Sequence, residues 1–464
     1  MKRADNNHIY KKFRTTYETF VYECYTINKN EAEVVLNFQF NLSNLYYFNP
    51  EIRIPKKSFF VNDNMSDDLL NNIVFNIGMI ELVSYWKTAC PKKVIIKPFS
   101  LSKSQIDFWK KIYFNGLGEF FYLNSIEADI NNFMEIEVDS DKKFTKVNIN
   151  NSSSTIIPIG GGKDSIVTLE LLRKFSENNL CLIMNPRGAT VKTIETAGYS
   201  MNDVFEIHRK IDPLLLELNS QGFLNGHTPF SALLAFVTVL AALLTNRKHI
   251  ALSNENSANE STVADTNINH QYSKSFEFEN DFRNYVSENI SESFNYFSFL
   301  RPLDEIQIAK LFSKFPKYHK VFRSCNAGSK TDVWCGNCPK CMFVYIILSP
   351  FLEKEKMIEI FGKNLLEDKN LTLYFDQLTG IEKVKPFECI GTVDEVNWSL
   401  NKIIEKQKDS ELPYLLKHYV SNHNFQNIKL KFDENLINHF NSEHFLIPEF
   451  EAILTEKLHE DIIK

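Results

Sequence analysis

Long apolar runs are absent from this chain of 464 residues. The longest run, residues 230–244, falls short of the roughly 20 residues that a membrane-spanning helix needs, so it predicts a buried helix. The N-terminal residues 1–8 are polar and lack the apolar core of a secretory signal. We therefore expect a cytoplasmic protein without a membrane partner, whose eight cysteines stay reduced.

An excess of positive charge is also absent. The 52 lysines and arginines are outnumbered by 58 aspartates and glutamates, which gives a net charge of −6. This balance removes the bulk electrostatic attraction on which nucleic-acid binding relies. We therefore expect a small-molecule substrate and no nucleic-acid partner.

Internal repeats and low-complexity linkers are not found either, and the hydrophobic content of 44% suffices for two or three domain cores. Residues 1–150 mix strand-like alternation with helical periodicity, which predicts an N-terminal α+β domain that could recognise the substrate. We expect residues 151–345 to form a second domain, which includes the clustered cysteines at 325–341. Residues 346–464 are mainly helical in pattern, with a start resembling a capping box at Thr392.

Three apolar runs indicate the fold of the middle region. They cover residues 154–159, 180–184 and 249–253, and helical stretches separate them. Strands that alternate with helices are typical of a parallel sheet covered by helices. The predicted fold class is therefore α/β.

The loop Gly160–Ser165, with the sequence GGGKDS, follows the first of these runs and opens a helical stretch. Glycines let backbone N–H groups approach an anion closely, and a helix N-terminus adds partial positive charge. The order of strand, loop and helix therefore predicts a phosphate site. The spacing is not that of a Walker A loop, and Lys163 and Asp164 do not fit the dinucleotide fingerprint.

Residue type indicates what each side chain of this loop can do. The glycine amides and the Ser165 hydroxyl can donate to phosphate oxygens. Lys163 can neutralise charge that develops on a leaving pyrophosphate. Asp164 can hold Mg²⁺ or cap the helix.

Four cysteines gather between residues 325 and 341 in the spacing C-x9-C-x2-C-x2-C. Four thiolates complete a tetrahedral Zn²⁺ shell and leave no coordination position for chemistry. We therefore expect a structural zinc knot and rank it above an iron–sulfur cluster. The predicted metal ligands are Cys325, Cys335, Cys338 and Cys341.

The loop is similar to the SGGxDS loop of the PP-loop (N-type) ATP pyrophosphatases, with Gly160 in place of the first serine. The resemblance implies a HUP-like parallel sheet domain in which ATP, with Mg²⁺, is cut between its α and β phosphates and adenylates a substrate. The predicted ATP-binding residues are then Gly160, Gly161, Gly162, Lys163, Asp164 and Ser165.

Within that superfamily the cysteine spacing is similar to that of 7-cyano-7-deazaguanine synthase. That enzyme is much shorter than this chain and has no counterpart of residues 1–150. One reading is nevertheless an adenylating enzyme that acts on a deazapurine, a tRNA base or a protein terminus.

Further segments resemble a different family, the ATP-dependent UDP-N-acetylmuramoyl-L-alanyl-L-glutamate epimerases (MurL). The resemblance extends from residue 78 to about residue 392 and so covers most of the chain. The segments that resemble this family are 78–87, 115–124, 225–231, 251–260, 269–279, 334–341 and 385–392.

The MurL resemblance implies a reaction. ATP would adenylate the α-carboxylate of the terminal L-glutamate of UDP-MurNAc-L-Ala-L-Glu and release pyrophosphate. An acyl adenylate withdraws electrons better than a carboxylate does, so its α-proton is more acidic. Removal of that proton, reprotonation on the other face and hydrolysis would give the D-glutamyl product and AMP.

Lys163 and Asp164 are the predicted catalytic residues of the loop. Three further residues are candidates for the proton transfer. Cys389 is one, because a thiolate can exchange an α-proton; the alternative is a buried structural cysteine. His227 and His270 are general acid/base candidates in polar, asparagine-rich stretches, where an ordinary hydrogen-bonding role is the alternative.

Three charged residues are candidates for binding substrate or Mg²⁺. Glu255 follows the strand-like residues 249–252 and should sit at the carboxyl end of a strand, where open α/β sheets build their sites. Lys274 and Arg301 could meet the anionic groups of the substrate. The alternatives are a polar loop for Glu255 and solvated surface charges for the other two.

Overall fold

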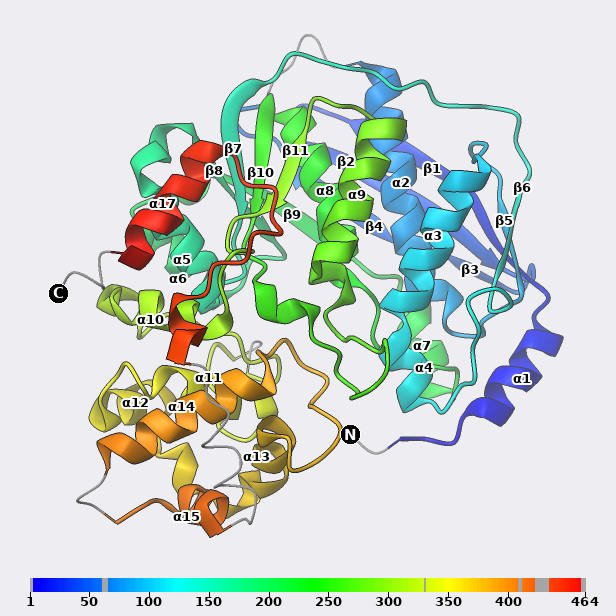
Figure 1. Ribbon diagram of the computed structural model, residues 1–464. Coiled ribbons are helices and arrows are strands. Elements are labelled where there is room, and N and C mark those ends of the chain that lie inside the picture. Colours follow the sequence, from blue (N-terminus) through cyan, green and yellow to red (C-terminus); the bar gives the residue numbers. More distant parts are fainter. Residues whose placement is uncertain (1–2, 61–65, 329–330, 408–410, 422–433, 460–464) are drawn as a thin grey trace.

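The computed structural model describes residues 3–60, 66–328, 331–407, 411–421 and 434–459. Strands in these residues join into one eleven-stranded sheet (Figure 1). Their bounds are β1 Thr19–Lys29, β2 Glu33–Leu42, β3 Tyr46–Phe48, β4 Glu51–Pro55, β5 Lys93–Ile96, β6 Glu135–Val138, β7 Ser152–Pro158, β8 Asn179–Met184, β9 Val204–Lys210, β10 Arg247–Leu252 and β11 Asn295–Ser298.

Helices cover both faces of this sheet and form the C-terminal region. Their bounds are α1 Asn7–Thr16, α2 Asp67–Trp86, α3 Lys103–Gly116, α4 Gly118–Leu123, α5 Lys163–Leu171, α6 Gly188–Ala197, α7 Pro213–Ser220, α8 Phe230–Leu244, α9 Phe276–Asn289, α10 Glu305–Ser313, α11 Pro339–Leu348, α12 Lys354–Phe361, α13 Thr372–Thr379, α14 Val393–Lys406, α15 Tyr414–Ser421 and α17 Pro448–His459.

The strands of the middle region are parallel, as the sequence predicts. They lie in the order β11-β10-β7-β8-β9, and each neighbouring pair is parallel. Successive connections lead from β7 to β8 and β9 on one side, and then to β10 and β11 on the other. The direction of winding therefore reverses between β7 and β10, and open α/β sheets bind ligands at the carboxyl ends of strands at such a point.

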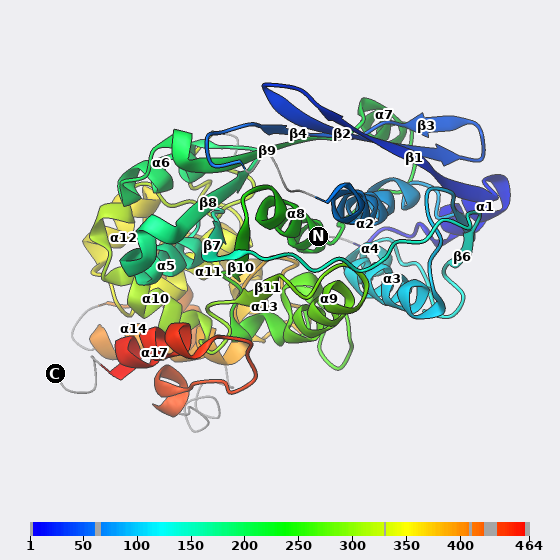
Figure 2. The same ribbon diagram turned by 90° about the horizontal axis from the view of Figure 1, so that it is seen from above.

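The strands of the N-terminal region extend the same sheet. β4 pairs antiparallel with β9, and β2 and β1 follow in antiparallel order. β5 and β6 then add parallel pairs at the far edge. Figure 2 shows β1, β2 and β4 continuing from β9, with α2 and α8 on one side of them and α7 on the other. The predicted domain limits at residues 150 and 345 stay predictions.

Alternating side chains of the parallel strands feed two separate cores. Ile156 and Leu182 point into the core shared with α2, α3 and α8, whereas Ile157 and Ile183 point into the core shared with α5, α10 and α11. Successive residues of a strand face opposite sides of the sheet, so apolar runs without polar alternation are what a sheet covered on both faces requires.

The longest apolar run is buried, as predicted. It forms α8, and every residue from Ala235 to Leu244 is buried. Among the helices of the described residues, none has the length and apolar character needed to cross a bilayer.

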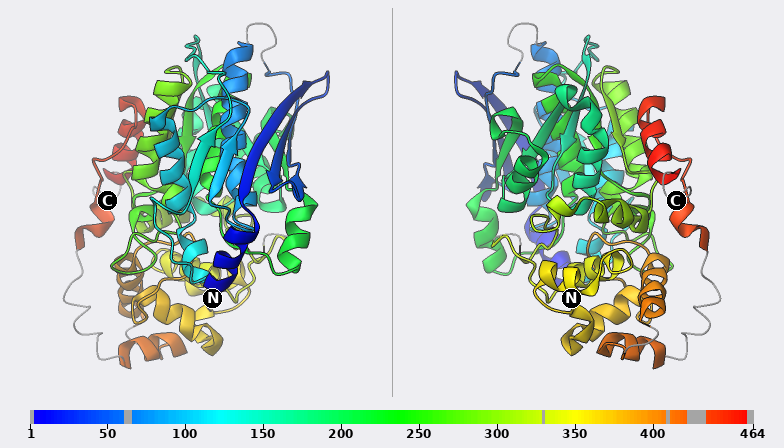
Figure 3. Two further views of the ribbon diagram at one scale, coloured as in Figure 1. Left: turned by 90° about the vertical axis from the view of Figure 1, so that its right-hand side faces the viewer. Right: turned by 90° about the vertical axis from the view of Figure 1, so that its left-hand side faces the viewer.

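The C-terminal region is helical, which confirms the prediction for it. Helices α11 to α15 form a body beneath the sheet (Figure 1), and α14 begins with the predicted capping box of Thr392 and Glu395. The last helix, α17, returns to the sheet, as Figures 1 and 3 show. Its Phe450 ring lies 5.7 Å from that of Phe297 on β11.

We expect the junction between the N-terminal and central strands to depend on one buried ion pair. Arg209 on β9 contacts Glu81 of α2 at 2.9 Å, and Glu81 is 1% exposed. Arg209→Ala leaves that carboxylate buried without a partner and should lower the free energy of unfolding by about 3 kcal/mol.

Arg53 on the neighbouring β4 is the matched control. Its pairs with Glu33 and Glu51 are exposed, so Arg53→Ala should cost less than about 1 kcal/mol. Thermal and urea unfolding of both variants measures the difference. Equal effects would show that the buried pair does not stabilise this junction.

Candidate active site

The glycine loop lies between β7 and α5, at the point where the winding of the sheet reverses. Gly161 has φ +79°, and a Cβ there would lie 3.0 Å from the backbone of Ala189 and Thr190 at the start of α6. Its carbonyl accepts a hydrogen bond of 2.8 Å from the amide of Arg323. Gly162 is the N-cap of α5 and offers no side-chain cap, so the amides of the first turn stay available to an anion.

Lys163 is buried at the start of α5 and forms ion pairs with Asp164 and Glu305. Burial opposes its charge, but these two carboxylates outweigh burial and raise the pKa of Lys163. Burial raises the pKa of Glu305 to about 7; Lys163 opposes this shift, and Asp164 and Glu255 add to it. Carboxylates that repel one another beside the glycine loop suit a hard divalent cation.

Glu255 and Lys274 lie beside this cluster. Glu255 follows β10, is 3% exposed, and has a pKa that burial raises. Burial opposes the charge of Lys274, but Cys389, Glu255 and Asp164 raise its pKa. The ammonium of Lys274 therefore interacts both with the loop and with the predicted thiol.

Arg301, the other predicted cation, is fully buried and binds backbone carbonyl groups. Its guanidinium donates to the carbonyls of Glu255 at 2.6 Å and Lys274 at 2.5 Å. It also forms an ion pair of 2.9 Å with Glu279. Arg301 thus fixes the two segments that carry Glu255 and Lys274.

The two predicted histidines are neighbours, and both contact a carboxylate that sequence reasoning missed. Glu119 of α4 lies 2.5 Å from Nδ1 of His270 and 3.6 Å from Nδ1 of His227. The two imidazole rings are 4.4 Å apart. The segment that precedes α8 is held in place by Asn124 and Lys87, which donate to its carbonyls at residues 225 and 226.

Cys389 lies next to His270 because two loops dock together. The amide of Lys385 donates to the carbonyl of Thr262 at 3.0 Å, and the amide of His270 donates to the hydroxyl of the same threonine at 3.0 Å. Gln271 binds the carbonyl of Ile390 at 2.9 Å. The side chains of Cys389 and His270 are close enough for each to shift the pKa of the other.

The charges of this cluster are strongly coupled. Burial opposes ionisation of Cys389, but Lys274, His270 and Lys340 lower its pKa to about 5. Burial also opposes the charge of His270, yet Cys389 and Glu119 raise its pKa to about 10. These shifts favour a thiolate and an imidazolium near neutral pH.

His227 is the neutral member of the cluster. Burial and the positive charges of His270, Lys87 and Lys274 lower its pKa to about 3. Two adjacent imidazoles thus hold different protonation states, because only His270 has the thiolate and the close carboxylate as partners.

The four predicted metal ligands come together. Their sulfur atoms all lie within 4.8 Å of one another, with individual separations of 3.5, 3.7 and 3.5 Å. A tetrahedral Zn²⁺ with Zn–S bonds of about 2.3 Å requires sulfurs about 3.8 Å apart. Backbone amides donate to three of the sulfurs, so the donor set and its spacing fit one tetrahedral metal ion.

Two more residues of the site were missed by sequence reasoning. Glu305 opens α10, and Lys340, between two metal ligands at the start of α11, donates to the carbonyl of Cys389. Glu119 lies within residues 115–124, one of the segments that carry the family resemblance, and that was the available signal. Lys340 lies within residues 334–341, another of these segments, and so had the same signal. Glu305 had none, because only the tertiary structure brings it to the loop.

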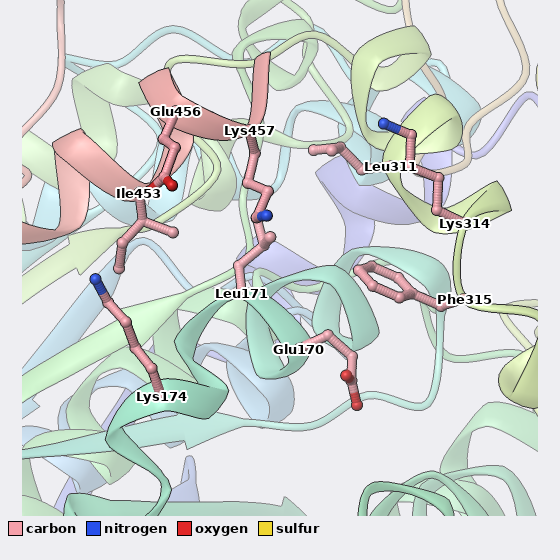
Figure 4. A pocket seen from close by; sticks show the side chains of 9 residues that line it. All are labelled: Glu170, Leu171, Lys174, Leu311, Lys314, Phe315, Ile453, Glu456 and Lys457. Atoms are coloured by element: carbon pink, nitrogen blue, oxygen red, sulfur yellow. The ribbon is translucent and has the colours of Figure 1, made fainter. Parts of the chain in front are cut away.

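A cleft of about 460 Å³ lies elsewhere, between α5, α10 and α17 (Figure 4). Its lining includes Glu170, Lys174, Leu311 and Phe315, which lie at or beyond the C-terminal ends of α5 and α10. Lys163 and Glu305 begin these same helices. We place the candidate site at the N-terminal ends, where the glycine loop lies and where Lys274 connects the charge of Asp164 with that of Cys389.

Fold and site together define a mixed α/β protein with a four-cysteine metal site and a buried acid–base cluster. The chain belongs to the MurL family. The model of the MurL N-terminal domain matches residues 11–299, and that of the MurL C-terminal domain matches residues 321–430.

Curated relatives agree with this assignment. The chain is 33% identical over 350 residues to the UDP-N-acetyl-alpha-D-muramoyl-L-alanyl-L-glutamate epimerase of a Micromonospora species, covering 74% of this chain and 77% of the relative. It is 35% identical to the enzyme of that name from Xanthomonas oryzae, over 68% of this chain and 70% of the relative. It is 34% identical to the enzyme of that name from Salinispora tropica, over 74% of this chain and 76% of the relative.

The loop geometry predicts different effects at two adjacent glycines. Gly161→Ala places a Cβ in a left-handed conformation and against the backbone of α6, so it should destabilise the protein by about 1–2 kcal/mol. Gly160→Ala is the matched control, because a Cβ there meets nothing within 4 Å. Thermal unfolding measures both variants, and equal stability would contradict the conformation described for Gly161.

Proposed function

We propose that this chain inverts the α-carbon of the terminal L-glutamate of UDP-MurNAc-L-Ala-L-Glu and so forms the D-glutamyl product used in peptidoglycan precursors. The relatives that carry this activity in their names are similar over most of both chains. One arrangement in the site supports the proposal. Arg301 holds the carbonyls of Glu255 and Lys274 together, and the charge of Lys274 interacts both with Asp164 of the glycine loop and with Cys389.

The proposed reaction needs both halves of the site. A carboxylate resists loss of its α-proton, because the carbanion would carry a second negative charge. Adenylation by ATP at the loop removes the carboxylate charge and releases pyrophosphate. The acid–base cluster then exchanges the α-proton, and hydrolysis releases AMP. Because ATP and UDP-linked precursors are cytoplasmic metabolites, we place the reaction in the cytoplasm.

The loop residues suit this use of ATP. The amides of Gly160, Gly161 and Gly162 and the hydroxyl of Ser165 would bind phosphate oxygens. Lys163 would shift from its carboxylate partners toward the charge of the leaving pyrophosphate. This assigns the middle of the chain to the PP-loop ATP pyrophosphatases, and the strand order β9-β8-β7-β10-β11 with the loop at its switch point supports the assignment.

A Mg²⁺ ion that accompanies ATP would find oxygen ligands in the same place. Asp164 is the ligand predicted from the sequence, and Glu305 and Glu255 lie beside it. The ion would neutralise phosphate charge during cleavage. The raised pKa values of Glu305 and Glu255 reflect a negative charge density that a cation relieves.

The proton transfer falls to the cluster of Cys389, His270 and His227. Glu119 contacts both histidines, and Cys389 interacts with His270. The sulfur is the member of the cluster whose ionised form is not paired with a carboxylate. Lys274, with its carbonyl held by Arg301, would bind the activated glutamyl group near that thiolate.

Four thiolates would hold a structural Zn²⁺ and leave no site for substrate on the ion. The ion would stabilise residues 325–341, which lead into α11 and position Lys340 against Cys389. Its role in the reaction is therefore indirect.

The function is tested by incubating the protein with ATP, Mg²⁺ and UDP-MurNAc-L-Ala-L-Glu and measuring AMP and the chirality of the glutamate. We expect AMP and D-glutamate together, and Lys163→Ala should lower AMP formation by about 100-fold or more. Lys192→Ala, at an exposed ion pair with Asp332, is the matched control and should keep full activity.

The outcomes separate two claims. AMP without D-glutamate would overturn epimerisation and leave an adenylating enzyme with another product. Substrate-dependent AMP formation by a folded Lys163→Ala variant at the normal rate would show that the loop is not the ATP site.

Metal analysis of the purified protein should find zinc near one ion per chain. Cys338→Ser should lose that ion and lower the melting temperature, because three ligands no longer close the shell. Cys181→Ser, at a buried cysteine of β8 outside the cluster, serves as the control and should retain zinc. Iron in place of zinc would contradict the assignment.

A further inference from the structure

We propose that Cys389 is the base that removes the α-proton of the activated glutamyl group, and that Glu119 is a positioning residue that acts on it through His270. The proposal rests on the proposed function, since it assigns a step of that reaction. Three elements far apart in the sequence, α4, the loop after β10 and the segment before α14, form this arrangement.

The geometry is that of an activated sulfur. His270 uses Nδ1 to contact Glu119 at 2.5 Å, which leaves its other ring nitrogen for an interaction with the nearby Cys389. A nucleophile or base held by a histidine that a third group orients is a recurring arrangement in enzymes that use a thiolate. The amide of His270 and the amide of Lys385, four residues before Cys389, both donate to Thr262, so the two segments are held together by backbone groups.

The charges that face Cys389 come from every element packed around it. Three cations favour the thiolate: Lys274 from the turn after β10, His270 from the loop before it, and Lys340 from α11. Two carboxylates oppose it: Glu255 after β10 and Glu388 in the same segment. The cations prevail, because the carboxylates are themselves buried and their pKa values are raised.

The step balances with water as the only further reactant. The Cα–H bond of the glutamyl adenylate breaks, its proton passes to the sulfur, and the electron pair delocalises into the activated carbonyl. A solvent-derived proton then adds to the opposite face of Cα. The thiol returns its proton to solvent, and hydrolysis of the adenylate completes the cycle.

Lys274 is placed to assist both the ionisation of Cys389 and the removal of the α-proton. Its ammonium interacts with Cys389 and, on the other side, with Glu255 and Asp164 of the ATP site. A cation between the base and the phosphate loop can stabilise the negative charge that the activated carbonyl gains as the proton leaves. Cys90 and Cys181 do not offer this, because both are buried and burial raises the pKa of both.

A metal ion is the alternative occupant for Glu119, His227 and His270, whose ligand atoms lie within 4.8 Å of one another. We favour the hydrogen-bonded arrangement. At 2.5 Å, Glu119 and Nδ1 of His270 are in direct contact, and an ion between them would require that contact to open. The proton shared between these atoms also keeps the second ring nitrogen of His270 directed to the sulfur.

Alkylation of the ligand-free protein tests the thiolate without any assay of activity. Peptide mapping after brief treatment with iodoacetamide should show Cys389 modified with a midpoint near pH 5, the value to which its cations lower the pKa. A free thiol has its midpoint near pH 8.5. Cys24 is the internal control, because its residue is exposed and its pKa is raised by partial desolvation of the thiol and by Glu23.

The same experiment tests Glu119. Glu119→Gln keeps a hydrogen-bonding group but removes the charge that holds His270 protonated, so the midpoint of Cys389 alkylation should rise by at least about one pH unit. Glu119→Asp keeps the negative charge, so its Cys389 midpoint should lie between those of the wild type and Glu119→Gln. A midpoint that does not move in a folded Glu119→Gln variant would overturn the positioning role.

Partial reactions test the base itself. In deuterium oxide the wild-type product should carry deuterium at Cα. Cys389→Ala and Cys389→Ser should lower that incorporation by about 100-fold or more and leave substrate-dependent ATP–pyrophosphate exchange within a few-fold. Cys24→Ala is the matched control and should change neither rate, and melting temperatures of all variants verify the fold.

The outcomes distinguish the proposal from the function on which it rests. If the wild type forms no AMP or D-glutamate, the proposed function fails. If the wild type epimerises and Cys389→Ala still exchanges the α-proton, the assignment of the base fails alone. An acyl adduct on Cys389 in the intact mass would make the sulfur a nucleophile, and a second metal ion lost in Glu119→Gln would make the cluster a metal site.

Discussion

The ammonium of Lys274 is the charge that joins the two halves of the site. It interacts with the sulfur of Cys389 and with the carboxylates of Glu255 and Asp164. Glu255 is buried and the other groups are partly buried. A buried charge without a partner is costly, so each of them limits where the others can be. Arg301 fixes the relative position of the two segments, because its guanidinium binds the carbonyls of both Glu255 and Lys274.

This charge network explains why the site draws on segments so distant in the sequence. α4 supplies Glu119, the loop after β10 supplies His270, and the segment before α14 supplies Cys389. The model of the MurL N-terminal domain covers the first two and that of the C-terminal domain covers the third. Neither part has a complete acid–base cluster, so the docking of residues 384–391 onto the loop after β10 completes the site. The four-cysteine cluster contributes by fixing the start of α11, from which Lys340 holds the carbonyl of Cys389.

Much of the fold follows from local pattern. The runs at 154–159, 180–184 and 249–253 became parallel strands because each feeds apolar side chains to both faces of the sheet. The run at 230–244 became a buried helix, and the capping box at Thr392 starts α14. The pairing of β4 with β9 had no such signal. It joins strands from different regions by backbone hydrogen bonds, and side-chain pattern does not encode which edge a strand will meet.

The amino-acid sequence by itself determined the groups whose chemistry is local: a glycine loop between strand and helix, and four cysteines at metal-binding spacing. It also supplied Cys389, His227 and His270 as candidates without showing that they meet. Only the tertiary structure decided their neighbours, and with them their ionisation. Glu305 entered the site through folding alone, and Glu119 and Lys340 lie in resembling segments that did not show what they contact. A pKa depends on the distance to other charges and on burial, and neither quantity is a property of the residue or its sequence neighbours.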